Sequence, residues 1–231
     1  MACTGAGVSA ESGIRTFRGQ DGLWKQYDPV RTSTLSYFLE DPAYYWRVSK
    51  ERWHTYRQAR PNPGHVALAE MEAGGSLAGV VTQNTDGLHR EAGSRRLVEL
   101  HGNGRTVRCL DCGASEPRAD VQARLEVELP PQCQTCGGVH IKPAVVFFGE
   151  PLPAGAIAEA VDLATQCDLM LVVGSSLAVR PAADIPLLAR RQGAPLLIVN
   201  DEPTPRDELA TVVLRGRSGE ILPEVRRLAG G

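Results

Sequence analysis

The chain of 231 residues is long enough for one large domain, or for one domain that carries an insertion. Its 25 basic and 27 acidic side chains leave a net charge of −2, which argues against nucleic-acid binding because such proteins usually carry a basic stripe. Hydrophobic residues make up 42% of the chain, as in globular domains, and no apolar run approaches the ~18 residues that a membrane-spanning helix needs.

A glycine-rich turn at Gly5-Ala6-Gly7 opens the chain, and only four residues precede it. A turn of this kind normally follows a buried strand, and four residues are few for a strand of ordinary length. We therefore expect the sheet to have a short or missing edge at this point, and we expect the natural protein to begin upstream of Met1.

Short β-branched runs alternate with longer amphipathic stretches along the rest of the chain. Strands are predicted over Leu77–Thr82, Arg96–Leu100, Val145–Phe148, Asp168–Val173, Pro195–Asn200 and Thr211–Leu214. Helices are predicted over His65–Ala73, Ala154–Gln166, Pro181–Gln192 and Gly219–Leu228. This alternation indicates βαβ units, and strands that are apolar throughout indicate a parallel sheet covered on both faces. The predicted fold class is therefore α/β.

Two stretches interrupt this rhythm. Residues 33–60 are rich in aromatic and charged side chains and predict helices on a half-exposed surface. Residues 106–141 hold two cysteine pairs and a Pro130-Pro131 step. The simplest architecture is one α/β domain with two insertions that form a smaller module.

Four of the six cysteines form two CxxC pairs, with 20 residues between Cys112 and Cys133. With their partners Cys109 and Cys136 they offer four thiolates for a tetrahedral Zn²⁺. A site closed by four sulfurs has no open position for water, so we expect a structural role for the metal. The sequence opens without a signal peptide, which favours the reducing cytoplasm and makes disulfides the weaker alternative.

Small and polar residues gather where predicted strands end, which is where open α/β sheets bind ligands. They are Gly5, Ala6, Gly7, Gln83, Asn84, Asp86, His101, Gly174, Ser175, Ser176, Asn200, Asp201 and Glu202. The glycines let a backbone approach phosphates, or they form a plain tight turn. The amide and carboxylate groups bind a ligand, or they stabilise turns. His101 is a general base, or it is structural.

The apolar run Lys142–Glu150 has two interpretations as well. It belongs to the core, or it forms an exposed edge to which a peptide adds as a strand.

At this point the residues resemble a known family, the sirtuins, which are NAD-dependent protein lysine deacylases. Seven motifs occur in the family's order and cover nearly the whole chain from Thr4 onward. They are GAGVSAESGIRTFRG, TQNTDGLHREAG, LHGN, the paired CxxC motifs, IKPAVVFFGE, VGSSLAVRPAA and VNDEPTP.

The resemblance implies a Rossmann-type NAD-binding domain made of residues 1–32, 61–105 and 142–231. It also implies a small domain made of a helical insert, 33–60, and a zinc ribbon, 106–141. NAD would lie in the cleft between the two domains. One structural zinc ion would be held by the four paired cysteines.

The resemblance also assigns roles to individual residues. His101 would be the catalytic base, with Asn84 also catalytic. The residues that contact NAD would be Gly5, Ala6, Gly7, Ser9, Ile14, Phe17, Arg18, Gln83, Asn84, Asp86, Gly174, Ser175, Ser176, Asn200, Asp201, Glu202 and Ser218. The residues beside the substrate peptide and its acyl-lysine would be Ser49, Arg52, Val145, Val146, Phe147 and Gly149.

The reaction implied by the resemblance transfers the acyl group from lysine to ADP-ribose. Nicotinamide leaves first, and His101 then accepts a proton from a ribose hydroxyl. Hydrolysis by one water molecule completes the reaction, and the products are nicotinamide, O-acyl-ADP-ribose and the free lysine. Partners would be acyl-lysine proteins or peptides bound by strand addition, and we expect a cytoplasmic monomer.

The motif Gly13–Arg18 is similar to that of the subgroup containing desuccinylases and demalonylases. That subgroup holds the acyl carboxylate with a Tyr-x-x-Arg pair, and the matching positions here are Ser49 and Arg52. Arg52 keeps the cation, whereas Ser49 lacks the phenol. We expect deacetylation as the main activity, with succinyl and malonyl removal weaker.

Two other functions stay open at this stage. A mono-ADP-ribosyltransferase on the same scaffold would break the same nicotinamide bond and pass ADP-ribose to a protein. A non-catalytic module would only bind NAD and zinc.

Overall fold

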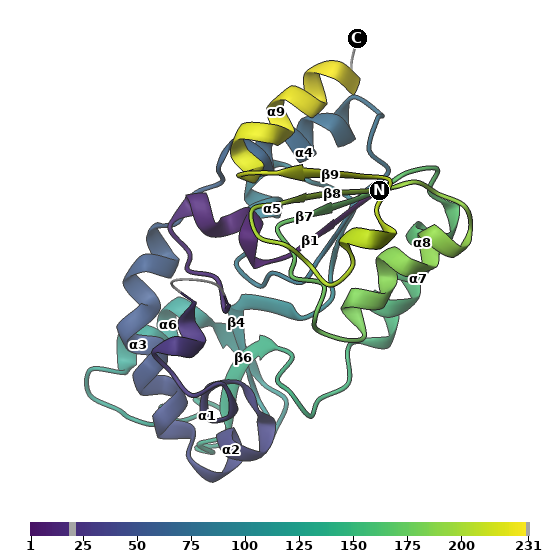
Figure 1. The fold of residues 1–231 in the computed structure, drawn as a ribbon. Helices are drawn as coiled ribbons and strands as arrows, with labels where there is room; N and C mark the ends of the chain where they lie inside the picture. The colour runs from purple at the N-terminus through teal and green to yellow at the C-terminus, as the bar shows by residue number, and fades with distance from the viewer. Residues whose placement is uncertain (19–21, 230–231) are drawn as a thin grey trace.

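The computed structural model describes residues 1–18 and 22–229, which form a parallel sheet with helices on both faces and a smaller module beside it (Figure 1). The sheet has six strands in the order β3-β2-β1-β7-β8-β9, and every neighbouring pair is parallel. The strands are β1 Ala2–Thr4, β2 Val80–Thr82, β3 Leu97–Glu99, β7 Met170–Val173, β8 Leu196–Asn200 and β9 Val212–Arg215. The predicted α/β fold class is confirmed.

Strand β1 lies in the middle of this sheet. Ala2 pairs with Val80 on one side and with Leu171 on the other. The expectation of a short strand at this place is correct, but the expectation of a sheet edge is wrong. Three residues are sufficient because both neighbouring strands provide hydrogen bonds and the side chains of β1 are buried.

The two faces of the sheet have separate apolar cores, because successive side chains of a strand point to opposite faces. One core contains Leu171 and Val173 of β7 with residues of α4 (Pro63–Ala73) and α9 (Ser218–Ala229). The other contains Met170 and Val172 with residues of α7 and α8. These two helices span Ala154–Gln166 and Ile185–Arg191, with a 3-10 turn at Ala182–Asp184 before the second. All four predicted helices are confirmed, three of them with shifted ends.

The smaller module combines helices with an antiparallel sheet in the order β5-β4-β6. The helices are α1 Pro29–Ser33, α2 Leu35–Glu40, α3 Pro42–Gln58 and α6 Arg118–Arg124, and the strands are β4 Gly102–Cys109, β5 Ser115–Pro117 and β6 Ile141–Val145. Trp46 is fully buried in its core and donates from Nε1 to the Ile141 carbonyl oxygen at 2.9 Å. This bond joins α3 to the small sheet.

The strand predicted over Val145–Phe148 is wrong for most of its length. The strand ends at Val145, and it belongs to the small antiparallel sheet. Phe147 turns into the core of the small module, and Phe148 makes only an isolated bridge to Thr34. Because β4 begins at Gly102 and β6 extends to Val145, this sheet uses residues on both sides of the range 106–141. The division into two domains stays a prediction.

Between Gly87 and Gly93 the chain forms the short helix α5, Leu88–Ala92, which residues 83–87 connect to the end of β2. Further 3-10 turns lie at Ala6–Ser12, Leu23–Lys25 and Asp207–Leu209. Among the described residues, no helix has the length and apolar character required to cross a membrane.

Candidate active site

The site lies at the carboxyl ends of the parallel strands. The chain runs outward from β1 to β3 on one side and crosses to β7, β8 and β9 on the other. The crevice at such a switch point is where open α/β sheets bind ligands. The turn after β1 holds Gly5 and Gly7, and the turn after β7 holds Gly174 and Ser175.

The glycines of these two turns allow the two backbones to touch. The Gly7 N–H donates to the Gly174 carbonyl oxygen at 2.7 Å. A Cβ atom on Gly7 would lie 2.7 Å from the Gly174 Cα, and one on Gly174 would lie 2.2 Å from the Val8 nitrogen. Close packing of the turns therefore requires glycine at both positions, a reason that sequence reasoning missed.

A buried polar network extends from the first turn to the end of β2. Ser9 Oγ donates to Asp86 Oδ2 at 2.8 Å and accepts from Asn84 Nδ2 at 3.1 Å. His65 Nε2 lies 3.3 Å from the same hydroxyl, while its Nδ1 accepts from the Asn62 N–H at 3.3 Å. The Asn62 contact places the His65 proton on Nε2. Ser9, Asn84 and Asp86, predicted from separate motifs, are thus brought together.

Two histidines of this region are kept neutral by burial. The rings of His65 and His89 lie 4.8 Å apart between centroids. Burial lowers the pKa of His65 to about 4 and that of His89 to about 3, and the neighbouring His65 lowers the latter further. His89 Nε2 lies 2.9 Å from Thr4 Oγ1, and its Nδ1 is buried without a hydrogen-bond partner among the described residues. Sequence reasoning did not select either ring.

His101 stands at the junction of the two sheets, between β3 and β4. Its Nδ1 lies 3.0 Å from the carbonyl oxygen of Gln83. A carbonyl oxygen only accepts, so Nδ1 carries the proton and Nε2 keeps its lone pair. Burial lowers the pKa of His101, and the bond to the Gln83 carbonyl opposes that effect. The neutral ring can therefore accept a proton at Nε2.

The Gln83 side chain ties the end of β2 to the end of β7. Its Nε2 donates to Ser175 Oγ at 3.0 Å, and that oxygen also accepts from the Leu177 N–H at 3.2 Å. Ser175 is buried and the adjacent Ser176 is exposed. Of the two serines expected to contact NAD, Ser175 holds the turn after β7 through these two hydrogen bonds.

Four of the residues expected to contact NAD, namely Asn200, Asp201, Glu202 and Ser218, lie at the end of β8 or after β9. Asn200 Nδ2 donates to the Glu202 carbonyl oxygen at 2.6 Å, while the side chains of Asp201 and Glu202 are exposed. Ser218 begins α9, and the following N–H, that of Gly219, donates to Glu11 Oε2 at 2.7 Å. Glu11 therefore links the first turn to α9, which no local sequence pattern indicated.

Phe17 and Arg18 lie beside Trp24, in the segment that follows the first turn. The Phe17 and Trp24 rings are 5.7 Å apart between centroids, and the Arg18 guanidinium lies 4.3 Å above the Trp24 ring. Trp24 also contacts Phe148, 6.4 Å away. Gly19, the last residue of the first motif, lies outside the described residues.

A pocket of about 220 Å³ lies between the segment after the first turn and helix α3. Its walls include Ile14, Tyr27, Arg52 and Tyr56. Burial lowers the pKa of Arg52, whereas nearby tyrosines such as Tyr45 oppose the shift. Arg52 thus presents a half-buried cation to this pocket.

Ser49 does not line that pocket. It is buried in α3, where its hydroxyl accepts from Arg118 Nη2 at 2.8 Å and from Gln122 Nε2 at 2.6 Å. The structure therefore separates the two members of the predicted Ser49–Arg52 pair.

The four paired cysteines come together in the small module. Their sulfur atoms all lie within 4.8 Å of one another, with Cys109 and Cys136 as well as Cys112 and Cys133 at 3.7 Å. Ligands about 2.3 Å from a tetrahedral Zn²⁺ are about 3.8 Å apart, so the set fits one zinc ion. The same distances exceed the ~2.05 Å of a disulfide.

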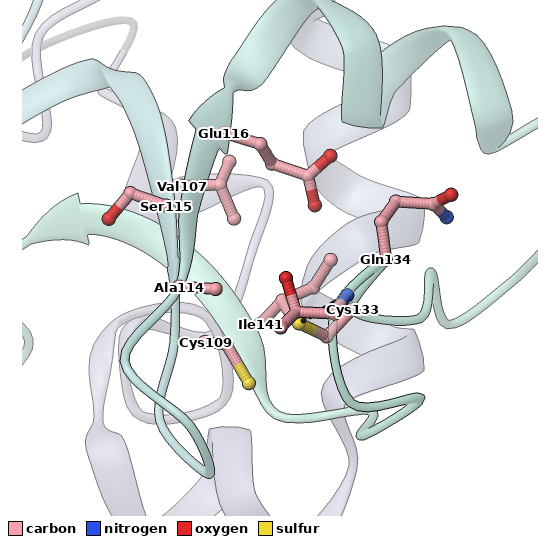
Figure 2. Close-up of a pocket in the computed structure, with 9 residues that line it drawn as sticks. Val107, Cys109, Ala114, Ser115, Glu116, Cys133, Gln134 and Ile141 are labelled. Carbon is pink, nitrogen blue, oxygen red and sulfur yellow. Dashed lines mark hydrogen bonds between the residues drawn. The ribbon is translucent and has the colours of Figure 1, made fainter.

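A small pocket of about 140 Å³ lies beside two of these cysteines, Cys109 and Cys133 (Figure 2). Val107 and Ile141 line it, and both belong to the core of the small module. The zinc ligands are therefore continuous with this core and lie apart from His101, in keeping with a structural metal.

Comparison with known proteins agrees with this geometry. The model of the Sir2 family matches residues 5–181. An NAD-dependent protein deacylase 2 of Archaeoglobus fulgidus is 47% identical over 229 residues, which is 97% of this chain and 90% of that protein. An NAD-dependent protein deacetylase of Sulfolobus acidocaldarius is 47% identical over 226 residues, 97% of this chain and 88% of that protein.

Solved structures match as well. One of them, a Sir2 protein with a p53 peptide and NAD⁺, has a TM-score of 0.91 and is 40% identical, over 99% of this chain and 92% of that chain. The sirtuin resemblance is thus confirmed, while the desuccinylase-like subgroup stays a prediction. The family match, the sequence identities and the shared fold show that the chain belongs to the Sir2 family.

Proposed function

We propose that this protein removes acyl groups, acetyl first, from protein lysines in an NAD-dependent reaction. The observation that carries the proposal is the neutral His101, whose Nδ1 faces the Gln83 carbonyl and whose Nε2 remains available as a base. It stands beside the Ser9–Asn84–Asp86 network at the switch point of the sheet. Relatives that are 47% identical carry the names NAD-dependent protein deacylase and deacetylase.

In this proposal NAD supplies the ADP-ribose that accepts the acyl group. His101 Nε2 takes the proton from a ribose hydroxyl, a step that general-base catalysis accelerates by about 10²–10⁴-fold. Asn84 is held by Ser9, so its amide is fixed before the ligand binds. Preorganised polar groups of this kind stabilise a transition state without the cost of reorganising them.

The remaining contacts divide between NAD and peptide. The phosphates lie against Gly5, Ala6 and Gly7, and the adenosine side lies against Ser176, Asp201, Glu202 and the Ser218 backbone. The acyl-lysine peptide adds as a strand beside the segment that holds Val145, Val146, Phe147 and Gly149. We further expect a cytoplasmic monomer, with peptides as partners and without nucleic acid or membrane.

One experiment tests the function directly. The protein is incubated with NAD and lysine peptides that carry acetyl, malonyl or succinyl groups, and mass spectrometry follows the products. The expected result is nicotinamide, O-acyl-ADP-ribose and the free lysine peptide. Label from NAD that becomes attached to protein would indicate ADP-ribosyl transfer, and no nicotinamide release with any peptide would indicate a binding module.

We expect the acetyl group to be a better substrate than the succinyl group because of the environment of Arg52. The cation lines the pocket, but Ser49 is occupied by Arg118 and Gln122 and lends no hydroxyl to an acyl carboxylate. Arg52 without the partner that the Tyr-x-x-Arg pair supplies gives weaker recognition of a carboxylate than the complete pair. We expect kcat/KM to be higher on the acetyl peptide, and a succinyl peptide that is used much better would contradict this order.

A further inference from the structure

A buried ion pair joins Lys142, the second residue of β6, to Glu150, which ends the turn that follows this strand. Lys142 Nζ lies 3.0 Å from Glu150 Oε2, and the Lys142 side chain is only 6% exposed. The same ammonium donates to the carbonyl oxygens of Val145 at 2.6 Å and Pro143 at 3.2 Å. An ammonium has three N–H donors, so all of them are used.

The Glu150 carboxylate closes the turn that follows β6. Its Oε2 accepts from the Phe147 N–H at 2.7 Å, and the Glu150 N–H donates to the Phe147 carbonyl oxygen at 3.0 Å. The Phe147 ring lies 4.5 Å from the Lys142 ammonium and is buried in the core of the small module. Both backbone groups of Phe147 are therefore held by Glu150.

The other residues of the turn are fixed as well. The Val146 N–H donates to the His101 carbonyl oxygen at 2.9 Å. The Phe148 N–H donates to Ser33, and the Phe148 carbonyl accepts from Leu35. Within the described part of the chain, the backbone of Gly149 makes no such bond.

Gly149 consequently has backbone groups without a hydrogen bond, among the described residues, in a turn whose other residues are anchored. It is exposed, and its φ of +94° lies in the left-handed region that glycine adopts without strain. The residues on either side of it are anchored, Phe148 by its backbone and Glu150 by its side chain. The direction of the Gly149 N–H and C=O therefore depends on the ion pair.

Stability alone gives little reason for such a pair. Removing two charges from water costs about as much as their attraction returns, and apolar replacements of similar volume are often no less stable. A role in fixing one conformation explains the pair better, because Lys142 bonds to the end of β6 while its partner Glu150 bonds to Phe147 in the turn that carries Gly149.

We propose that Lys142 and Glu150 are positioning residues for the acyl-lysine peptide, because their ion pair holds the Gly149 backbone in the direction in which it pairs with the peptide strand. The inference rests on the proposed function. Neither residue touches the NAD site, so the pair acts on peptide affinity and leaves NAD affinity alone.

Three variants and one control test the proposal. Glu150→Gln keeps an acceptor for the Phe147 N–H but removes the charge, Lys142→Met removes the cation, and the double variant removes both. Lys50→Met is the control, since it breaks the equally short but exposed pair with Glu126 at 2.8 Å. A fluorescein-labelled acetyl-lysine peptide reports the peptide Kd, and steady-state kinetics give the KM values of peptide and NAD.

The two single variants leave a buried charge unpaired and are expected to melt earlier, while the double variant recovers stability. In the double variant the peptide Kd and KM are expected to rise by about tenfold, with the NAD KM unchanged, since a preorganised loop has been released. Lys50→Met is expected to resemble wild type in both values.

A peptide Kd in the folded double variant equal to that of wild type would overturn the inference. So would peptide and NAD KM values that rise together. If the wild-type protein neither binds the peptide nor releases nicotinamide, the proposed function is wrong. If wild type does both and the double variant binds peptide equally well, only the positioning role is wrong.

Discussion

The Nδ1 atom of His101 lies 3.0 Å from the carbonyl oxygen of Gln83. This contact determines which nitrogen of the ring is free, because a carbonyl oxygen requires a proton on its partner. The Gln83 side chain reaches in the opposite direction to Ser175. One residue at the end of β2 thus orients the proposed base through its backbone and holds the turn after β7 through its amide.

Replacing His101 by alanine tests the proposed base. We expect nicotinamide formation with an acetyl-lysine peptide to fall by about 10²–10⁴-fold, the range for loss of a general base. Zinc content and melting temperature are expected to stay near those of wild type, since the ring is only half-buried. His54→Ala, on the exposed side of α3, is the matched control. Turnover like that of wild type in His101→Ala would remove His101 from the mechanism.

The pH dependence of the reaction follows from the direction of the His101 shift. Burial lowers the pKa of the ring below its ordinary value of 6.5, so the base stays neutral to a lower pH. The acid limb of kcat/KM is therefore expected to have its midpoint below pH 6.5. A pH–rate profile measured with the acetyl peptide checks this, and a midpoint above 6.5 would contradict a base kept neutral by burial.

Much of the fold could be predicted from the sequence because its signals are local. Strand β7, with Met170–Val173 buried on both faces, is an uninterrupted apolar run, and α7 begins and ends at the predicted residues. Strand β4 was missed because Arg105, Thr106 and Arg108 point to solvent and interrupt its apolar pattern. The small sheet depends on pairing across the zinc module, which no local pattern shows.

The candidate site divides in the same way. Residue type and position after a strand were sufficient to mark Asn84 and His101 as candidates, and the family resemblance supplied the catalytic roles expected of them. The partners that orient them come from other parts of the chain: Ser9 lies 75 positions from Asn84, and Gln83 lies 18 positions from His101. Such contacts exist only after folding, so sequence reasoning selected the candidate groups but not the residues that hold them.

Loss of one cysteine tests the metal site. Cys112→Ala is expected to reduce zinc from one ion per chain to almost none and to lower the melting temperature, because Cys109 and Cys133 are part of the core of the small module. Cys167→Ala, outside the cluster, is the control. Zinc is measured by atomic absorption after dialysis. A Cys112→Ala protein that keeps one zinc per chain would exclude the four-cysteine site.

The His65–His89 pair makes stability depend on pH. In the folded chain the pKa of His65 is about 4 and that of His89 is about 3, compared with an ordinary value of 6.5. Below pH 6.5 the two histidines bind protons in the unfolded chain but stay neutral in the folded chain. The free energy of unfolding therefore falls as the pH is lowered toward 4. Each ring contributes about 1.4 kcal/mol per pH unit in this window.

Replacing His89 by glutamine removes one of these two contributions. The difference in unfolding free energy between pH 6 and pH 5, measured by urea titration, is expected to shrink by about 1 kcal/mol relative to wild type, because only His65 still resists protonation. Taking the difference between variant and wild type cancels the effect of acid on the zinc site, which both proteins share. His54→Gln, which replaces an exposed ring, is the matched control. An equal pH dependence in His89→Gln and wild type would show that His89 titrates alike in the folded and unfolded chains, contrary to its burial between Thr4 and His65.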